Sequence, residues 1–536
     1  MEDADSLIAD MESPDGVLYI PNRKVDISQY RELSRNTHFM LTDVEAVQLR
    51  NDSRVLAVEQ PPRELGIEVV RHWRQTGDFE KNSSVTSTDK NWGLYRVVAG
   101  EQLPGWGVGA SFTQTTQTVT LTSSGKNVDV VIVDAHINPD HPEFAVNVDG
   151  TGGSRVVQFD WYSLSNTIGV NTVGSYDYSI VSSNHGTHVA GTACGNTQGW
   201  ARDANIYNME FAYEGENALF NWELYIFDYL RAFHLNKPIN PTTGRRNPTI
   251  TNHSWGYSYN NIFLSQISGH TYRGVFTNIS ALTTADKKTS LESNGVPVPA
   301  GTYLFRMPYT YPALNADIED AIADGVVVVA AAGNSYWNSA YPGDQDYNNS
   351  IRVSGIDYFH SRGSSPAVAD GVIVVGNIGV SAQEYKALSS NFGNRVDIYA
   401  PGTNIISSVY DSSALSEFGS LVNDLRNSNY KLSSISGTSM ASPQVCGVIA
   451  CYAEQNPNIN SFEALEYLTL NSKKNQIGSN GIDYGDYEWF GDNGNNRYLF
   501  YKLERPLFGQ SFPKTTFKNR PATGSVYPRT RISRTQ

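Results

Sequence analysis

Val130-Val131-Ile132-Val133-Asp134 is the stretch that decides the fold. A run of β-branched residues with no polar residue among them is typical of a strand buried on both faces of a sheet. Further strand-like runs lie at residues 204–209, 248–252, 326–329 and 372–375, and helical patterns lie at about 185–194, 219–235, 313–324 and 439–454. This alternation predicts an α/β fold with a doubly wound, mostly parallel sheet covered by helices on both faces.

Polar residues follow three of these runs. Asp134 ends the first run, Ser254 follows the run at 248–252, and Asn334 follows the run at 326–329. In open α/β sheets, ligands bind beyond the carboxyl ends of the strands. We therefore expect these side chains to converge at one edge of the sheet.

A serine and a histidine lie at the starts of two predicted helices. The two segments are Ser436-Gly437-Thr438-Ser439-Met440-Ala441-Ser442-Pro443 and His185-Gly186-Thr187-His188-Val189-Ala190-Gly191-Thr192. A serine hydroxyl becomes a nucleophile when a histidine takes its proton and a carboxylate holds the tautomer of that histidine. The chain order Asp134, His185, Ser439 is one of the orders in which this geometry occurs in serine proteases.

These segments, with Ala331-Ala332-Gly333-Asn334, resemble the signature segments of the subtilisin-like serine peptidases (subtilases, peptidase S8 family), in the order of that family. The resemblance implies a subtilisin-like fold and a serine endopeptidase that acts on polypeptide substrates and needs no cofactor. It implies that Ser439 is the nucleophile, that His185 is the general base and then acid, and that Asp134 orients His185. Asn334 would donate its side-chain amide to the oxyanion, beside the backbone N–H of Ser439.

Each of these residues has a plainer interpretation when taken singly. An aspartate that closes a strand is usually a turn residue, a histidine at a helix start is usually a polar cap, and an asparagine after Ala-Ala-Gly usually belongs to a turn. None of these explains four residues in the order of one family with its flanking residues. Pro443 also fits a helix start, because proline is tolerated in the first turn.

The resemblance also indicates a substrate site. Asn252-His253-Ser254-Trp255-Gly256 resembles the substrate-binding strand of the family, so we expect Ser254, Trp255 and Gly256 to bind an extended peptide by main-chain pairing. An equally good interpretation of Trp255 is a core residue. Ala330, Ala331, Ala332 and Gly333 are expected to line an S1 pocket, whose small walls favour large apolar or aromatic P1 groups.

One departure from the family pattern adjoins the aspartate. The family usually has Thr or Ser and then Gly at the positions that Ala135 and His136 occupy here. Ala135 removes a hydroxyl near the carboxylate, and His136 replaces a residue with greater backbone freedom. We expect His136 to face outward; the alternative is that it alters the electrostatics of the site.

Insertions are a second departure, at about residues 256–313, 410–430 and 235–247. The first directly follows the substrate strand, so we expect it to rim the groove and narrow specificity. The calcium-binding loop that many relatives carry after the histidine helix is expected to be absent, because residues 195–199 leave little room. Carboxylates at 343–346 and 483–496 could bind Ca²⁺, but neither loop has EF-hand spacing, and solvated turns are the better interpretation. No zinc motif is present, and we predict no metal site.

Composition limits the partners. A net charge of −14 argues against nucleic acid as the main partner. Residues 505–536 hold seven Lys and Arg and no Asp or Glu, which leaves −21 on the rest of the chain. We interpret this basic tail as a solvated extension, and contact with an acidic surface or nucleic acid is the alternative. Cys194, Cys446 and Cys451 fit no disulfide framework and are predicted to be buried apolar residues, which suits a reducing compartment.

The N-terminus is acidic and lacks the apolar segment of a Sec signal, and no apolar run of about 18 residues occurs. We therefore expect no membrane partner and a cytoplasmic or virion-associated location, a phage-encoded protease being one possibility.

Residues 1–90 are predicted to form a small α+β, ferredoxin-like unit similar to the propeptides of the family. Thr42-Asp43-Val44-Glu45 is a capping box that opens a helix to about residue 49, between strands at 38–41 and 54–59. Propeptides of the family assist folding, inhibit the enzyme and are removed by self-cleavage. We therefore predict cleavage within about residues 80–91, a peptidase domain at 91–475 that binds its own propeptide, and a C-terminal extension at 476–536.

The alternative from another functional class is a non-catalytic structural or assembly protein, such as a virion component, on a subtilase scaffold. The insertions, the basic tail and the missing signal peptide allow it. The presence of Asp134, His185, Ser439 and Asn334 together argues against it, because a retired site has no reason to keep them.

Overall fold

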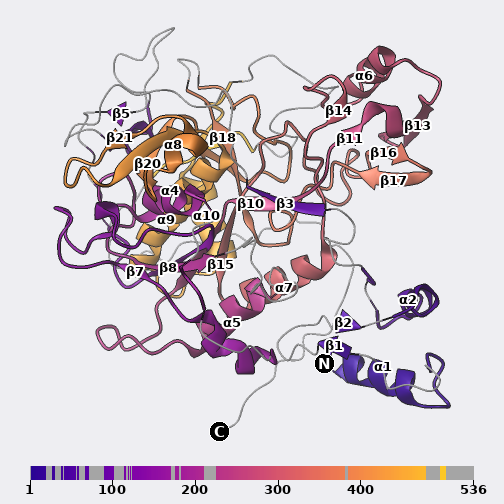
Figure 1. Ribbon diagram of the computed structural model, residues 1–536, viewed down its shortest axis with the longest axis horizontal. Helices are drawn as coiled ribbons and strands as arrows, with labels where there is room; N and C mark the ends of the chain where they lie inside the picture. Colours follow the sequence, from indigo (N-terminus) through magenta and orange to yellow (C-terminus); the bar gives the residue numbers. More distant parts are fainter. Residues whose placement is uncertain are drawn as a thin grey trace.

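The structure is a computed structural model (Figure 1). It describes residues 2–19, 27–29, 38–39, 41–55, 57–59, 67–71, 90–101, 114–115, 119, 121, 123–170, 176–179, 183–210, 225–380, 384–478 and 495–501. Three predicted features lie wholly or mostly outside these residues: the basic tail at 505–536, most of the cleavage region at 80–91, and most of the carboxylate loop at 483–496.

A nine-stranded sheet forms the centre of the molecule, in the order β23-β24-β19-β18-β15-β9-β6-β8-β7. Neighbouring strands are parallel except for β23 and β24. The strands are β6 (Asp129–Asp134), β7 (Val156–Val157), β8 (Asn205–Glu210), β9 (Thr249–His253), β15 (Val327–Ala331), β18 (Ile373–Ile378), β19 (Ile398–Pro401), β23 (Lys473–Lys474) and β24 (Arg497–Tyr498). The mostly parallel sheet is confirmed, and the five predicted runs are β6, β8, β9, β15 and β18.

Helices cover both faces of this sheet. Successive strand residues point to opposite faces, so β6 contributes to two cores. Val130 and Ile132 share one core with residues of α4 (His185–Cys194) and α9 (Thr438–Gln455). Val131 and Val133 share a second core with residues of α5 (Ile226–Asn236) and α7 (Pro312–Ala323). Because β6 lies between two hydrophobic cores, it needs apolar residues on both of its faces.

Shorter elements complete the main body. They are α3 (Trp92–Ala99), α8 (Ala414–Phe418), α10 (Ser461–Asn471), the 3₁₀ helices η2 (Pro142–Phe144) and η3 (Trp161–Ile168), a three-stranded sheet of β20 (Ile405–Val409), β22 (Lys431–Ile435) and β21 (Val422–Asn423), and the pair β4 (Lys90–Asn91) and β5 (Gln114–Thr115).

The strand order reverses at β6, and this reversal places the site. From β6 the chain reaches β8 on one side and β9 on the other. A crevice opens at such a switch point beyond the carboxyl ends of the strands. Asp134 ends β6, Ser254 follows β9, and Asn334 lies three residues beyond β15.

The first insertion begins within β10 (Trp255–Tyr259) and contributes to a separate hydrophobic core, in which Leu264 and Leu291 pack with Trp337 from beyond the insertion. Its elements are β11 (Ile262–Phe263), η5 (Leu264–Gln266), β12 (Ile267–Tyr272), β13 (Val275–Asn278), α6 (Thr284–Glu292) and β14 (Tyr303–Leu304). β12 and β13 join β16 (Ser350–Val353) and β17 (Ile356–Phe359) in a separate antiparallel sheet. This insertion lies at one end of the molecule, adjacent to β10 (Figure 1).

The N-terminal elements are α1 (Glu2–Glu12), β1 (Ile27–Gln29), β2 (His38–Phe39), α2 (Asp43–Arg50) and β3 (Ile67–Arg71). The predicted capping box is confirmed, because Thr42 and Glu45 exchange side-chain and backbone hydrogen bonds at the start of α2. The strand predicted at 54–59 is wrong: the described residues there form turn and coil, and Arg54 instead binds Asp10 and Asp52. The ferredoxin-like unit remains a prediction.

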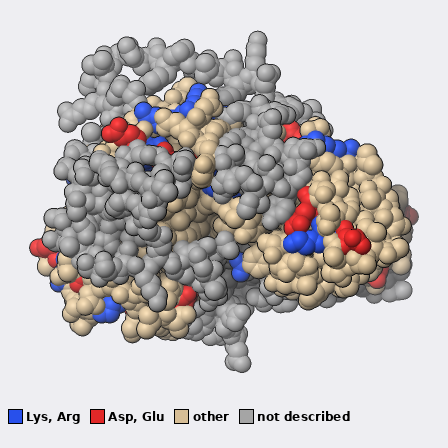
Figure 2. All heavy atoms as spheres, turned by 90° about the horizontal axis from the view of Figure 1, so that it is seen from above, with Lys and Arg blue, Asp and Glu red and all other residues tan. Residues whose placement is uncertain are grey.

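The three cysteines are buried and free, as predicted. Among the described residues, no helix combines the length and apolar character needed to span a bilayer. Figure 2 shows one face of the molecule, on which the described Lys and Arg side chains are interspersed with Asp and Glu and form no single basic patch.

Candidate active site

Asp134 and His185 form the centre of the site. Nδ1 of His185 lies 2.6 Å from Oδ1 of Asp134, and both side chains are buried. The same carboxylate oxygen accepts a 2.7 Å hydrogen bond from the backbone N–H of Ala135. The carboxylate therefore fixes the orientation of the imidazole and leaves Nε2 as the nitrogen that can exchange a proton.

Close packing of α4 against the loop after β6 brings this pair together. A Cβ atom at Gly186 would lie 2.0 Å from the carbonyl oxygen of Ala135, so only glycine permits this approach. Thr187 then donates its hydroxyl to the carbonyl oxygen of His136 at 3.2 Å.

The segment that carries His185 contains a second histidine, and the structure distinguishes the two. Nε2 of His188 lies within 3.1 Å of the carbonyl oxygens of Ile405 and Ser433, whereas His185 has the carboxylate of Asp134 as its partner. Burial lowers the pKa of His188 and of His253, on β9, to about 3. Both are therefore neutral at ordinary pH.

Ser439 lies in the first turn of α9, and Pro443 shapes its surroundings. The helix begins at Thr438, so Pro443 lies beyond the first turn, contrary to the prediction. Proline has no N–H, so the carbonyl four residues earlier, that of Ser439, loses its helical donor. The hydroxyl of Ser254 donates to this carbonyl at 3.0 Å, and the hydroxyl of Ser439 donates to the carbonyl of Ser254 at 3.2 Å.

A chain of side chains behind the site fixes this arrangement. Ser442 donates to Oδ1 of Asn252 at 2.7 Å, and Nδ2 of Asn252 donates to the hydroxyl of Ser254 at 2.9 Å. Asn252 thus links β9 to α9 beside Ser439. Sequence reasoning included Asn252 in the substrate segment but gave it no role, because only the folded chain brings it to Ser442.

Asn334 lies with its amide held in one orientation. Its Oδ1 accepts hydrogen bonds from the backbone N–H (2.9 Å) and hydroxyl (3.0 Å) of Thr438, the residue before Ser439. Its Nδ2 is buried and has no hydrogen-bond partner among the described residues. A buried amide donor beside the serine, with its acceptor already satisfied, can donate to a developing oxyanion.

The loop that carries Asn334 is held by a residue that sequence reasoning missed. Oδ1 of Asn391 accepts from the N–H groups of Ser335 and Trp337, and its Nδ2 donates to the carbonyl of Ala332 at 2.8 Å. Gly333 has φ +104°, which a residue with a side chain rarely adopts. No local pattern in the sequence marks Asn391.

The predicted S1 residues lie at this loop. Ala331 ends β15, and Ala332 and Gly333 lead directly to Asn334. Gly333 donates its N–H to the hydroxyl of Thr438 at 3.2 Å, so this segment packs against the start of α9.

The predicted substrate strand, residues 252–256, spans the end of β9 and the start of β10, and β3 pairs with β10. Residues 67–71 pair with it in antiparallel register, with Arg71 opposite Trp255 and Val70 opposite Gly256. The indole of Trp255 is buried and donates to the carbonyl of Val133 at 3.0 Å. Its contacts are those of a core residue, which was the alternative interpretation.

The prediction that His136 faces outward is wrong. Its ring is buried, and Nδ1 lies 3.3 Å from Oε2 of Glu210 at the end of β8. Tyr410 and Tyr178 enclose the ring edge-on. The neighbouring strand β8 supplies this partner, which the sequence around Asp134 could not indicate.

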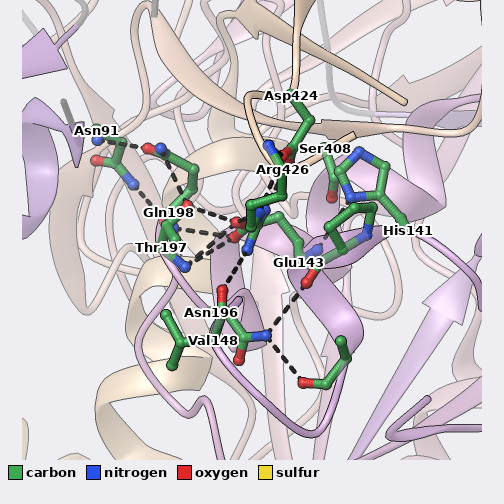
Figure 3. A network of polar contacts seen from close by, with 12 residues as sticks. Asn91, His141, Glu143, Val148, Asn196, Thr197, Gln198, Ser408, Asp424 and Arg426 are labelled. Carbon is green, nitrogen blue, oxygen red and sulfur yellow. Dashed lines mark hydrogen bonds and ion pairs between the residues drawn. The ribbon is translucent and has the colours of Figure 1, made fainter. Parts of the chain in front are cut away.

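The loop after α4 is closed by a buried ion-pair network (Figure 3). The fully buried carboxylate of Glu143 accepts from the N–H and hydroxyl of Thr197, from the N–H of Gln198, and from Nη2 of Arg426 at 2.5 Å. Arg426 also binds Asp424 at 2.6 Å. All of the donors to Glu143 are N–H and O–H groups of the protein, including the Arg426 guanidinium, so the hydrogen-bonding needs of this carboxylate are met without a metal ion.

Among the described residues, no group of three or more His, Cys, Asp and Glu is arranged to hold a metal ion. In the 343–346 loop, Asp344 accepts from the N–H of Tyr341 and the amide of Asn394, and Asp346 binds Arg273. Protein donors therefore occupy these carboxylates.

A known protein family and several curated proteins are similar to this chain in sequence. The model of the subtilase family matches residues 125–486. Curated relatives include subtilisin-like serine protease pepC of Aspergillus niger, 24% identical over 84% of this chain and 65% of its own length. Alkaline protease 2 of Aspergillus fumigatus is 25% identical over 77% of this chain and 61% of its own length. The chain thus spans somewhat less than two thirds of these relatives, and these fungal proteins give no support to a phage origin.

Among solved structures, a cold adapted subtilisin-like serine proteinase is similar, with 20% identity and a TM-score of 0.43. The alignment covers 79% of this chain and 100% of that one.

Proposed function

The chain belongs to the subtilase family, and we propose that it is a serine endopeptidase in which Asp134, His185 and Ser439 act as the catalytic triad. The hydroxyl of Ser439 attacks the peptide carbonyl while Nε2 of His185 takes its proton. The C–N bond then breaks, and the same proton leaves with the amine. Water, deprotonated by His185, hydrolyses the acyl-enzyme and restores the Ser439 hydroxyl.

The arrangement of Asn334 carries this proposal. An asparagine whose oxygen is bound by Thr438 and whose buried nitrogen has no described partner is costly to keep in a structural role. The same amide, together with the N–H of Ser439, stabilises a tetrahedral oxyanion. A retired scaffold has no use for this orientation, which disfavours a purely structural or assembly function.

A fluorophosphonate probe, which reacts with activated serines, tests the proposal. We expect labelling of the wild-type chain and none of Ser439→Ala. Ser416→Ala is the matched control, because Ser416 is exposed and lies outside the site, and it should label like wild type. Absence of labelling in the wild-type chain, after removal of its N-terminal segment, would favour the non-catalytic alternative.

We further propose that the enzyme processes itself. β3 pairs with β10, which begins with the last two residues of the predicted substrate strand, and Arg71 is one pairing position from the residue that would face Ser254. A bond shortly after Arg71 is therefore a second candidate for cleavage beside the 80–91 region. N-terminal sequencing of the active protein distinguishes the two, and Ser439→Ala should stay full-length. Met1 retained on active enzyme would refute self-processing.

A further inference from the structure

The two edges of β10 have different partners. The N–H of Tyr257 donates to the carbonyl of Ser365, and the N–H of Tyr259 donates to the carbonyl of Met307. The carbonyl of Tyr257 accepts from the N–H of Tyr309. Because main-chain groups alternate in direction along a strand, Gly256 and Ser258 direct theirs to the opposite edge, where β3 pairs.

The edge of β10 that β3 occupies pairs with five consecutive residues in antiparallel register. Trp255 pairs with Arg71, Tyr257 with Val69, and Tyr259 with Ile67. Ser254 and Ser439 exchange hydrogen bonds, so a substrate residue that faces Ser254 carries the attacked carbonyl. Counting along the same register, the residue that faces Tyr259 is the sixth before the cleaved bond.

Three tyrosines from separate segments meet at that sixth position. The ring of Tyr259 packs edge-on against Tyr309 (5.2 Å between centroids) and Tyr358 (5.1 Å). All three rings are half-buried. Tyr309 comes from the end of the first insertion and Tyr358 from β17, a strand of the separate sheet that this insertion joins, so the insertion and this sheet together build the surface beside β10.

Directly opposite residues of an antiparallel pair share one face, so a substrate side chain that faces Tyr259 contacts this aromatic surface. We propose that Tyr259, Tyr309 and Tyr358 form a subsite that selects an apolar side chain six residues before the cleaved bond. This proposal rests on the proposed peptidase function and deepens it. It assigns to the first insertion, and to the separate sheet that it joins, a role in recognising long substrates.

The test compares two fluorogenic peptides that differ only in the sixth residue before the cleaved bond, Ile in one and Asn in the other. Partial burial of an aliphatic substrate side chain is expected to raise kcat/KM about three- to tenfold over a polar side chain of similar size. We expect the wild-type enzyme to prefer the Ile peptide by this factor and Tyr358→Ser to lose most of the preference. Ile356→Ser is the control, because Ile356 is exposed on the same strand and outside the tyrosine group, and its preference should stay.

Equal cleavage of both peptides by wild-type enzyme, at a bond confirmed by mass spectrometry, would overturn the subsite alone. Full preference in folded Tyr358→Ser would overturn it also. Failure to cleave either peptide, together with no fluorophosphonate labelling of Ser439, would instead overturn the proposed function and with it the subsite.

Discussion

Replacing Asn334 tests the proposed oxyanion role directly. Loss of one such donor typically lowers kcat by about 10²–10³, which is about 2.7–4 kcal/mol of transition-state stabilisation. Asn334→Ala also leaves the N–H and hydroxyl of Thr438 without their acceptor, at a cost of about 1–3 kcal/mol of folding stability. Since domains are stable by about 5–15 kcal/mol, we expect a folded protein with a crippled kcat.

Asn334→Asp separates the two effects. The carboxylate keeps an acceptor for Thr438 but removes the donor and places a negative charge where the oxyanion develops. We expect kcat to fall at least as far as in Asn334→Ala, with a smaller loss of stability. Steady-state kinetics on a peptide substrate give kcat and KM, and urea unfolding gives the stability of each variant.

Two kinetic results would contradict an oxyanion role for Asn334. An amide that acts on the transition state lowers kcat and leaves KM within a few-fold of wild type. Wild-type kcat from folded Asn334→Ala would remove the oxyanion role. A rise in KM at unchanged kcat would instead indicate a residue that only binds substrate.

Further predictions concern the triad, the ion-pair network and the N-terminal segment. Asp134→Asn should lower kcat by about 10⁴ in a folded enzyme because the imidazole loses the tautomer that it needs, and a loss below tenfold would contradict that role. Arg426→Met leaves two carboxylates buried without their guanidinium and should cost about 3–5 kcal/mol in urea unfolding, whereas a chelator should leave the wild-type midpoint unchanged. A chelator-sensitive midpoint would contradict a network closed by protein donors. Glu59 accepts the N–H of Ala313 at the start of α7, and burial raises the pKa of this carboxyl from 4.5 to about 7. Glu59 holds its proton up to a higher pH when the N-terminal segment is docked on α7 than when it is free. Docking should therefore be tightest below pH 4.5 and weaken as the pH rises to 7. Limited proteolysis of full-length Ser439→Ala should show this weakening, and a second change, Glu59→Gln, should abolish it; identical pH profiles would refute the contact.

Local patterns predicted the elements that carry the site. The run 130–134 lies in β6, with its aspartate at the end of the strand, and the helices predicted at 185–194 and 439–454 are α4 and α9 with shifts of at most one residue. These elements can be predicted locally, because a strand buried on both faces has apolar residues at consecutive positions and a buried helix has small and apolar residues along one continuous segment.

Two of the wrong predictions, for His136 and for residues 54–59, have the same physical cause. His136 is buried because Glu210, on a neighbouring strand, supplies a partner for its ring. Residues 54–59 contain a strand-like pattern, yet the described part of this segment forms turn and coil, and Glu59 there docks on α7. In both cases a contact with a distant segment overrides the local pattern.

The sequence by itself determined the sheet, the helices that flank it and the identity of the four candidate catalytic residues, since alternation and flanking motifs are written in adjacent positions. Only the tertiary structure decided what holds them: Thr438 on the amide of Asn334, Ser254 on the carbonyl that Pro443 leaves free, and Arg426 on Glu143. The partners in these pairs lie 104, 185 and 283 residues apart in the chain. No local periodicity can encode such pairs, because each partner gains its energy only after the sheet has brought both to the same place.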